Sequence, residues 1–65
     1  MMADGIRQGD AVVFARLDLA EFLGIWRHAR GRVVGVRAAT GTVDVKFEGH
    51  ATLQEYLPAM FRRVG

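Results

Sequence analysis

Residues 31–48 read GRVVGVRAATGTVDVKFE, two apolar segments separated by a short turn. The second segment, residues 42–48, alternates apolar and polar side chains, which is the pattern of a half-buried strand. The first segment, residues 31–37, is apolar without clean alternation, and Gly35 marks the expected position of a bulge. The turn ends in Gly41, which is suited to a positive φ. The stretch therefore predicts a β-hairpin.

The segments on either side extend this hairpin into a small all-β fold. Residues 10–15 predict a first strand, and residues 17–26 show helical spacing that should stop near Gly24. Residues 57–61 predict a 3₁₀ turn that begins at a proline, and residues 62–64 a last strand. The order of strand, long loop with a short helix, hairpin, strand, 3₁₀ turn and terminal strand predicts an all-β, SH3-like small barrel of about five strands.

Specific contacts follow from this arrangement. Asp18 and Glu21 imitate a capping box at the helix start. A two-residue turn at 40–41 would place Arg37 opposite Asp44 in the hairpin. The side chains expected to point into the barrel are Val12, Phe14, Val33, Val36, Val43, Val45, Phe47, Leu57, Phe61 and Val64.

The length and composition narrow the classes of function. Sixty-five residues permit one domain, which we expect to span residues 9–65 after a flexible N-terminus of residues 1–8. The absence of cysteine and serine excludes disulfides, thiolate metal sites, cysteine nucleophiles and the serine triad. His28 and His50 have no carboxylate at metal-ligand spacing, so no metal is expected. No secretion signal or membrane-spanning run is recognised, which predicts a cytoplasmic protein without a membrane partner.

The apolar residues exceed what one small barrel can bury. A domain of this size has a marginal core, and with disulfides excluded we expect a homo-oligomer, a dimer or a tetramer, to supply the missing stability. The interface is predicted to contain Phe22, Leu23, Ile25, His50 and Leu53. If His50 is buried there without charge, protonation below about pH 6 should weaken the assembly.

The basic residues suggest an anionic partner. Eight of the nine are arginine, and the net charge is +2. Four lie in an eleven-residue stretch without an acidic residue and are predicted to bind a ligand: Arg27, Arg30, Arg32 and Arg37. A phosphate backbone is one possible ligand, with Trp26 stacking on a base. The alternative is that Arg27 and Arg30 are solvated, while the other two pair with acidic residues across the hairpin.

Short motifs along the chain resemble known SH3-like families. They are Gly9-Asp10-x-Val12, Trp26, Gly31-x-Val33-Val34-Gly35, His50, Leu53-Gln54-Glu55-Tyr56 and Arg62-Arg63-Val64. The outline resembles small accessory subunits of photosystem I and of ferredoxin–thioredoxin reductase. Locally, the motifs are most similar to the plasmid-borne type II dihydrofolate reductases, over most of residues 9–64.

The reductase resemblance implies a homotetramer whose central pore holds NADPH and dihydrofolate. Gln54 and Tyr56 match pore residues and would be the catalytic candidates, and His50 matches a residue at a pH-sensitive subunit contact. Two positions depart from the pattern, because Glu55 replaces an isoleucine and Phe14 stands at or near a lysine. Both changes oppose anionic ligands.

The sequence therefore favours a non-catalytic module that binds a protein or an anionic ligand through its arginines and the 53–56 segment. An NADPH-dependent reductase and a nucleic-acid-binding barrel are the alternatives, and no cofactor is expected outside the first of these. In the non-catalytic interpretation, Gln54 and Tyr56 are a polar and an aromatic residue that lead into the 3₁₀ turn.

Overall fold

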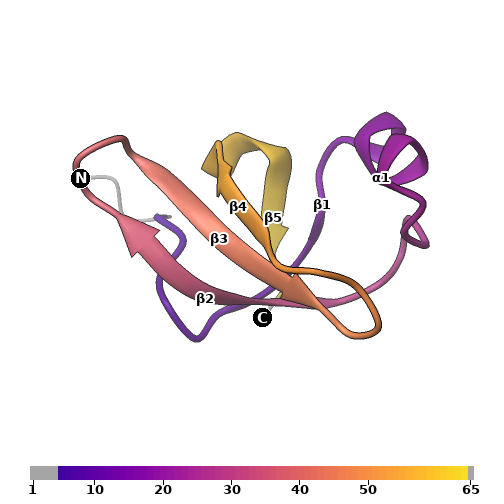
Figure 1. The fold of residues 1–65 in the computed structure, drawn as a ribbon, viewed down its shortest axis with the longest axis horizontal. Coiled ribbons are helices and arrows are strands. Elements are labelled where there is room, and N and C mark those ends of the chain that lie inside the picture. The colour runs from indigo at the N-terminus through magenta and orange to yellow at the C-terminus, as the bar shows by residue number, and fades with distance from the viewer. Residues whose placement is uncertain (1–4, 65) are drawn as a thin grey trace.

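The structure, a computed structural model, describes residues 5–64. It contains five strands, one helix and one 3₁₀ turn: β1 (Ala11–Phe14), α1 (Leu17–Leu23), β2 (Gly31–Arg37), β3 (Thr42–Phe47), β4 (Leu53–Tyr56), η1 (Pro58–Met60) and β5 (Phe61–Arg63). All strand pairs are antiparallel, in one sheet of order β4-β3-β2-β1-β5 (Figure 1). Within residues 5–64 no pairing joins β4 to β5, so the sheet is open and the closed barrel expected from the sequence is not formed.

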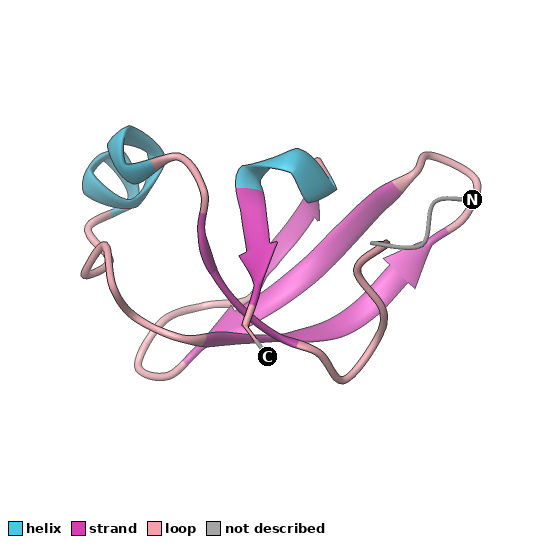
Figure 2. Ribbon diagram, turned by 180° about the vertical axis from the view of Figure 1, so that it is seen from behind, coloured by secondary structure: helices cyan, strands magenta, loops and turns pink. Residues whose placement is uncertain are grey.

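The helix and the hairpin turn occupy opposite ends of the molecule. Figures 1 and 2 show α1 at one end and the turn between β2 and β3 at the other. β1 lies between β2 and β5 and pairs with both, but it meets only Gly31 and Arg32 of β2. Backbone hydrogen bonds from the 9–10 segment continue this contact as far as Val33. Beyond Val33, β2 pairs with β3 alone among residues 5–64.

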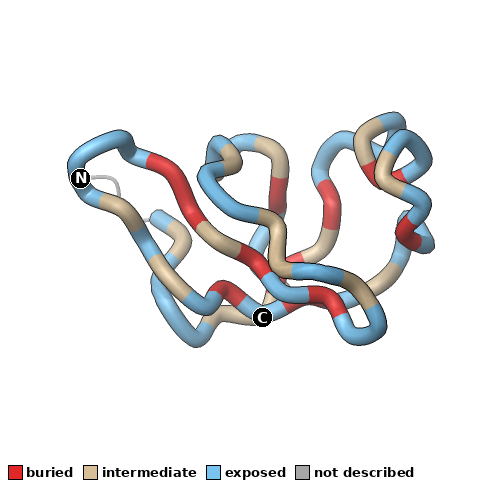
Figure 3. Tube along the Cα trace, viewed as in Figure 1, coloured by how far each residue is buried: buried red, intermediate tan, exposed pale blue. Residues whose placement is uncertain are grey.

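Aromatic rings fill the centre of the core. The rings of Phe14 and Phe47 stack with centroids 4.7 Å apart, and Phe61 packs on both at 5.6 and 6.4 Å. Gly31 is directly opposite Phe47 in the sheet, and a Cβ placed on it would come within 2.8 Å of Phe47 Cζ. The ring therefore covers the space where a side chain at position 31 would lie. Figure 3 shows buried positions along β1, β3 and β5.

The hairpin forms as predicted in outline but not in register. The pairing of β2 with β3 shifts between Val33 and Gly35, which confirms the bulge, and Gly41 has a φ of 71°. Arg37 pairs with Thr42 rather than with Asp44, so the turn contains four residues instead of two. The predicted partners still meet, because the Arg37 side chain reaches diagonally to Asp44 at 3.1 Å.

The helix begins at Leu17 and stops before Gly24, as the sequence predicts. It ends at Leu23, and Gly24 follows in the left-handed conformation with a φ of 75°. The predicted capping box is wrong, because Arg16 is the N-cap, without a side-chain cap, and Asp18 lies inside the first turn. Asp18 instead accepts hydrogen bonds from the Arg16 guanidinium, at 2.7 Å to Nη2.

Several residues expected to point inward do not. Val36 is 48% exposed because it lies on the part of β2 that β1 does not reach, and Leu57 is 56% exposed where it precedes η1. Val64 is half-buried. Ala20 and Ile25 join the core instead, at 0% and 5% exposed.

The predicted division of the chain stays a prediction. Residues 1–4 and 65 lie outside the described residues. In the described part of the expected N-terminal segment, Ile6 packs partly against the core. The backbone N–H of Arg7 donates a hydrogen bond to Asp10 Oδ2 at 2.8 Å.

Candidate functional site

Charged side chains are divided unequally between ion pairs and the free surface. Three arginines hold four of the six carboxylates of residues 5–64 in the pairs Arg16–Asp18, Arg37–Asp44, Arg37–Glu55 and Arg63–Asp10. The cations that have no carboxylate within ion-pair distance in this part of the chain are Arg7, Arg27, Arg30, Arg32, Lys46 and Arg62. In the same residues, Glu21 and Glu48 are the only carboxylates without an ion pair. The unpaired charges on the surface are therefore mostly positive.

Three of these free cations meet in one groove on the outer face of the sheet. Arg30, Arg32 and Lys46 line an open groove of about 540 Å³ together with Glu48. Strand alternation explains the grouping: the buried Gly31 faces inward, so its neighbours on both sides face outward. The small or apolar residues Ala11, Gly31, Val34 and Gly49 complete the lining. We refer to this site as the cationic groove.

Two of the three groove cations, Arg32 and Lys46, are anchored by backbone oxygens rather than by carboxylates. Arg32 Nη1 donates a hydrogen bond to the carbonyl of Gly9 at 2.7 Å. Lys46 Nζ donates to the carbonyl of Phe47 at 3.1 Å and to the carbonyl of His50. These bonds orient the side chains without cancelling their charge. Because Arg32 and Lys46 are direct cross-strand partners, their repulsion opposes folding.

Arg37, predicted to bind a ligand, lies elsewhere and is already paired. It is five residues further along β2 than Arg32, roughly 16 Å away at the usual strand rise. Its guanidinium bonds Asp44 and also Glu55 at 3.1 Å. The hydrogen bond from Arg37, followed by that from the backbone N–H of Glu55, lowers the pKa of Asp44 from its ordinary value. This network joins β2, β3 and β4, so Arg37 serves the fold.

The residues that resemble a reductase pore are on β4. Gln54 is exposed, while Tyr56 is half-buried with its ring 6.3 Å from that of Phe61. Between them, Glu55 has a φ of 61° and bonds both Arg37 and Asp44. The contacts of Glu55 join β4 to β2 and β3, and the ring of Tyr56 packs beside Phe61, so these contacts contribute to the fold. The reductase, its NADPH and the roles of Gln54 and Tyr56 stay predictions.

Arg27 belongs to a second, separate surface. Glu21, Ile25, Trp26 and Arg27 line a hollow of about 310 Å³ beside α1, and it shares no lining residue with the cationic groove. Trp26 is 68% exposed and meets the ring of His28 edge-on, with centroids 5.1 Å apart.

The five residues predicted for an interface are not equally available. Phe22 is 85% exposed, the highest value among the large apolar side chains of residues 5–64. Leu23, His50 and Leu53 are half-buried, and Leu23 and Leu53 pack against the core. Ile25 is in the core, because the chain reverses at Gly24 and turns this side chain inward, and its place in an interface stays a prediction.

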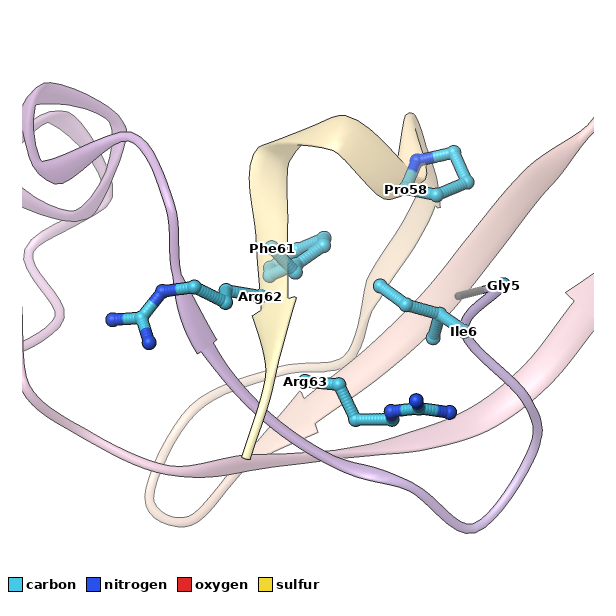
Figure 4. A pocket seen from close by; sticks show the side chains of 6 residues that line it. All are labelled: Gly5, Ile6, Pro58, Phe61, Arg62 and Arg63. Atoms are coloured by element: carbon cyan, nitrogen blue, oxygen red, sulfur yellow. The ribbon is translucent and has the colours of Figure 1, made fainter. Parts of the chain in front are cut away.

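A third hollow, of about 520 Å³, lies between the start of the described chain and β5. Figure 4 shows Ile6 and Pro58 on one side of it and the guanidinium of Arg62 directed away from both. Arg63 also lines it but approaches Asp10 at 3.9 Å. The hollow therefore gathers less free charge than the cationic groove.

Lys46 is the site residue that the sequence pattern does not single out. The alternation of residues 42–48 places it on the polar face, but its role depends on which residue of β2 lies opposite. That residue is Arg32. The register expected from the sequence, with Arg37 opposite Asp44, does not place these two residues opposite each other, so the pair could not be predicted.

Residues 5–64 contain no cluster of three His, Cys, Asp or Glu side chains that could hold a metal ion. Among the same residues, no helix has the length and apolar character needed to cross a membrane. Comparison with family models, curated proteins and solved structures yields no match to this chain.

Proposed function

We propose that this protein is a non-catalytic binding module of SH3-like topology that takes a multivalent anion in the cationic groove. The order of its elements supports the topology. The helical segment separates β1 from β2, β2 to β4 follow one another in the sheet, and η1 precedes the strand that returns to β1. The function rests on the groove itself, not on the topology.

The single observation that carries the proposal is the set of three free cations around one concave surface. Arg30, Arg32 and Lys46 line the groove, and none is within ion-pair distance of a carboxylate of residues 5–64. Like charges placed together repel one another and destabilise a fold. A bound anion neutralises these charges, and the relief of their repulsion adds to the free energy of binding. The cationic groups present attract and orient negative charge.

The ligand is defined by phosphate or carboxylate groups in series. Guanidinium groups bind both kinds of anion in bidentate fashion, and the lysine adds a point charge. In the lining, Ala11 and Gly31 carry little or no side chain, so a ligand backbone can approach the sheet there, and the 46% exposed Val34 offers an apolar contact beside them. Trp26 does not line this groove, so base stacking there contributes nothing to a nucleic acid bound in it.

Binding is best tested with three probes that separate the sources of negative charge. They are inorganic polyphosphate, a single-stranded oligonucleotide and a polyglutamate peptide, titrated by isothermal calorimetry at several salt concentrations. Contact with three phosphates predicts a slope of log K against log salt near −2 for the oligonucleotide, using about −0.7 for each contact. Glu48, which also lines the groove, should repel every anionic probe. It should weaken the binding of the peptide less than the binding of polyphosphate, which is longer and more densely charged.

A charge reversal locates the site. Arg30→Glu removes a groove cation that holds no ion pair in the described chain, and it should lower affinity at least tenfold and reduce the salt slope by about one. Arg62→Glu is the matched control, because it makes the same charge change at an exposed arginine that also holds no ion pair in residues 5–64 and does not line the groove. Absence of binding at low salt, or equal losses from the two variants, would overturn the proposal.

A further inference from the structure

The end of α1 presents an apolar surface that the fold leaves uncovered. Phe22 and Trp26 are the most exposed large apolar side chains of residues 5–64, at 85% and 68%. Leu17, which is 45% exposed, lies one helical turn before Glu21 on the same face. We refer to Leu17, Glu21, Phe22, Trp26 and Arg27 as the helix patch. Solvent-exposed apolar residues that gather in this way mark an interaction surface.

We propose that the helix patch binds a second copy of this chain across a two-fold axis. Phe22 projects from the helix, and the hollow of about 310 Å³ begins at its neighbour in the chain, Glu21. A projection and a hollow on one surface allow a closed pair, because the two-fold axis carries the Phe22 of each copy to the hollow of the other. Ile25 forms the base of that hollow and is already part of the core. The inserted ring would therefore extend the core of the partner.

The charges around the hollow identify the occupant. Glu21 and Arg27 both line it, carry opposite signs and have no ion-pair partner within residues 5–64. A two-fold axis that passes between the two positions brings Glu21 of each copy to face Arg27 of the other. A surface that carries both members of an ion pair is complementary to itself, whereas a uniformly charged partner would satisfy one of the two residues and repel the other.

The chain also benefits from such a partner. A fold of this size buries only about 60% of the surface that its unfolded chain exposes, less than a larger domain does, and with no cysteine it has no disulfide to strengthen it. Burying two copies of Phe22 and Trp26 removes large apolar area from water without changing the fold of either copy. The helix patch shares no residue with the cationic groove, so the dimer leaves both grooves open.

Sedimentation velocity tests the pairing without any ligand, so the result is independent of anion binding. The wild-type chain should be a dimer when its concentration is raised to about 0.5 mM, and Phe22→Asp should be a monomer at the same concentration. Leu57→Asp is the matched control, since it introduces the same charge at an exposed apolar residue outside the patch. Circular dichroism establishes that each variant keeps its strands.

Charge exchange provides the decisive result. Glu21→Arg and Arg27→Glu should each weaken self-association at least tenfold, because each places like charges opposite one another twice in the dimer. A mixture of the two single variants should form heterodimers, and the double variant should recover the wild-type dimer. A monomeric wild-type chain, a dimer that survives Phe22→Asp, or single variants that do not associate when mixed would each overturn the inference.

Discussion

The replacement Gly31→Ala measures how tightly the centre of the sheet is packed. An alanine Cβ at this position would approach Phe47 Cζ to 2.8 Å and the two Cε atoms to 2.9 Å, which is closer than carbon atoms pack. The Phe47 ring is 1% exposed and is held against Phe14 at 4.7 Å, so it cannot turn aside freely. Either the ring or the strand must therefore move.

Two effects of opposite sign determine the result. Inserting a methyl group into a packed core costs about 1–3 kcal/mol. Replacing glycine also restricts the unfolded chain, which returns about 0.4–1 kcal/mol. The clash outweighs this gain, and we expect a net loss near 1.5 kcal/mol, which corresponds to a fall in Tm of about 6–12 °C for a domain of this size.

Urea denaturation at one protein concentration checks this value. The midpoint should fall while the m-value stays unchanged. Phe47→Leu removes the ring atoms that the new Cβ would meet, so Gly31→Ala should cost much less stability when it is made in the Phe47→Leu variant. The double-mutant cycle should give a coupling free energy of about 0.5–3 kcal/mol. If Gly31→Ala were as stable as wild type, or if the cycle showed no coupling, the packing argument for Gly31 would be wrong.

Two further predictions concern the core and the ion-pair network. Phe14→Ala removes the ring that stacks on Phe47 and packs on Phe61, at a cost of about 3–5 kcal/mol, and circular dichroism at 25 °C should show a largely unfolded chain. Because the pKa of Asp44 is lower in the folded chain than in the unfolded chain, its contribution should be complete above about pH 5 and should be lost as the pH falls through the folded pKa. Urea midpoints measured from pH 7 to pH 2.5 should therefore fall less in Asp44→Asn than in wild type; equal falls would contradict a role for this carboxylate.

Local patterns predict the parts of the fold that depend on neighbouring residues. The hairpin of residues 31–48, its bulge at Gly35 and the 3₁₀ turn at Pro58 each follow from a few adjacent side chains, and each forms. The errors arise where distant segments decide the outcome. Val36 is expected to point inward as part of the apolar segment of residues 31–37, yet it is exposed because β1 ends its pairing at Arg32.

At the end of the helix, too, the sequence pattern alone does not predict which residues are exposed. Spacing alone places Trp26 on the face of Leu19 and Leu23, and a helix continued to residue 26 would keep it there. Gly24 ends the helix in a left-handed conformation, so Ile25 enters the core and Trp26 faces solvent. The left-handed conformation of Gly24 therefore places Ile25 in the core and leaves Trp26 on the surface. The helix patch depends on this placement.

The two proposed surfaces are built from side chains that the fold does not need. Arg37 and its two carboxylates join three strands, and Arg16 pairs within the helix start, so charges that support structure are satisfied locally. The cations of the groove oppose one another instead, and Phe22 gains nothing from its exposed position in a single copy. Departures from the most stable arrangement are expected where a protein binds something, because the ligand or partner supplies the missing interaction. Substitutions at Arg30 and Phe22 therefore report on binding with little effect on the core, whereas substitutions at Gly31 and Phe14 report on folding.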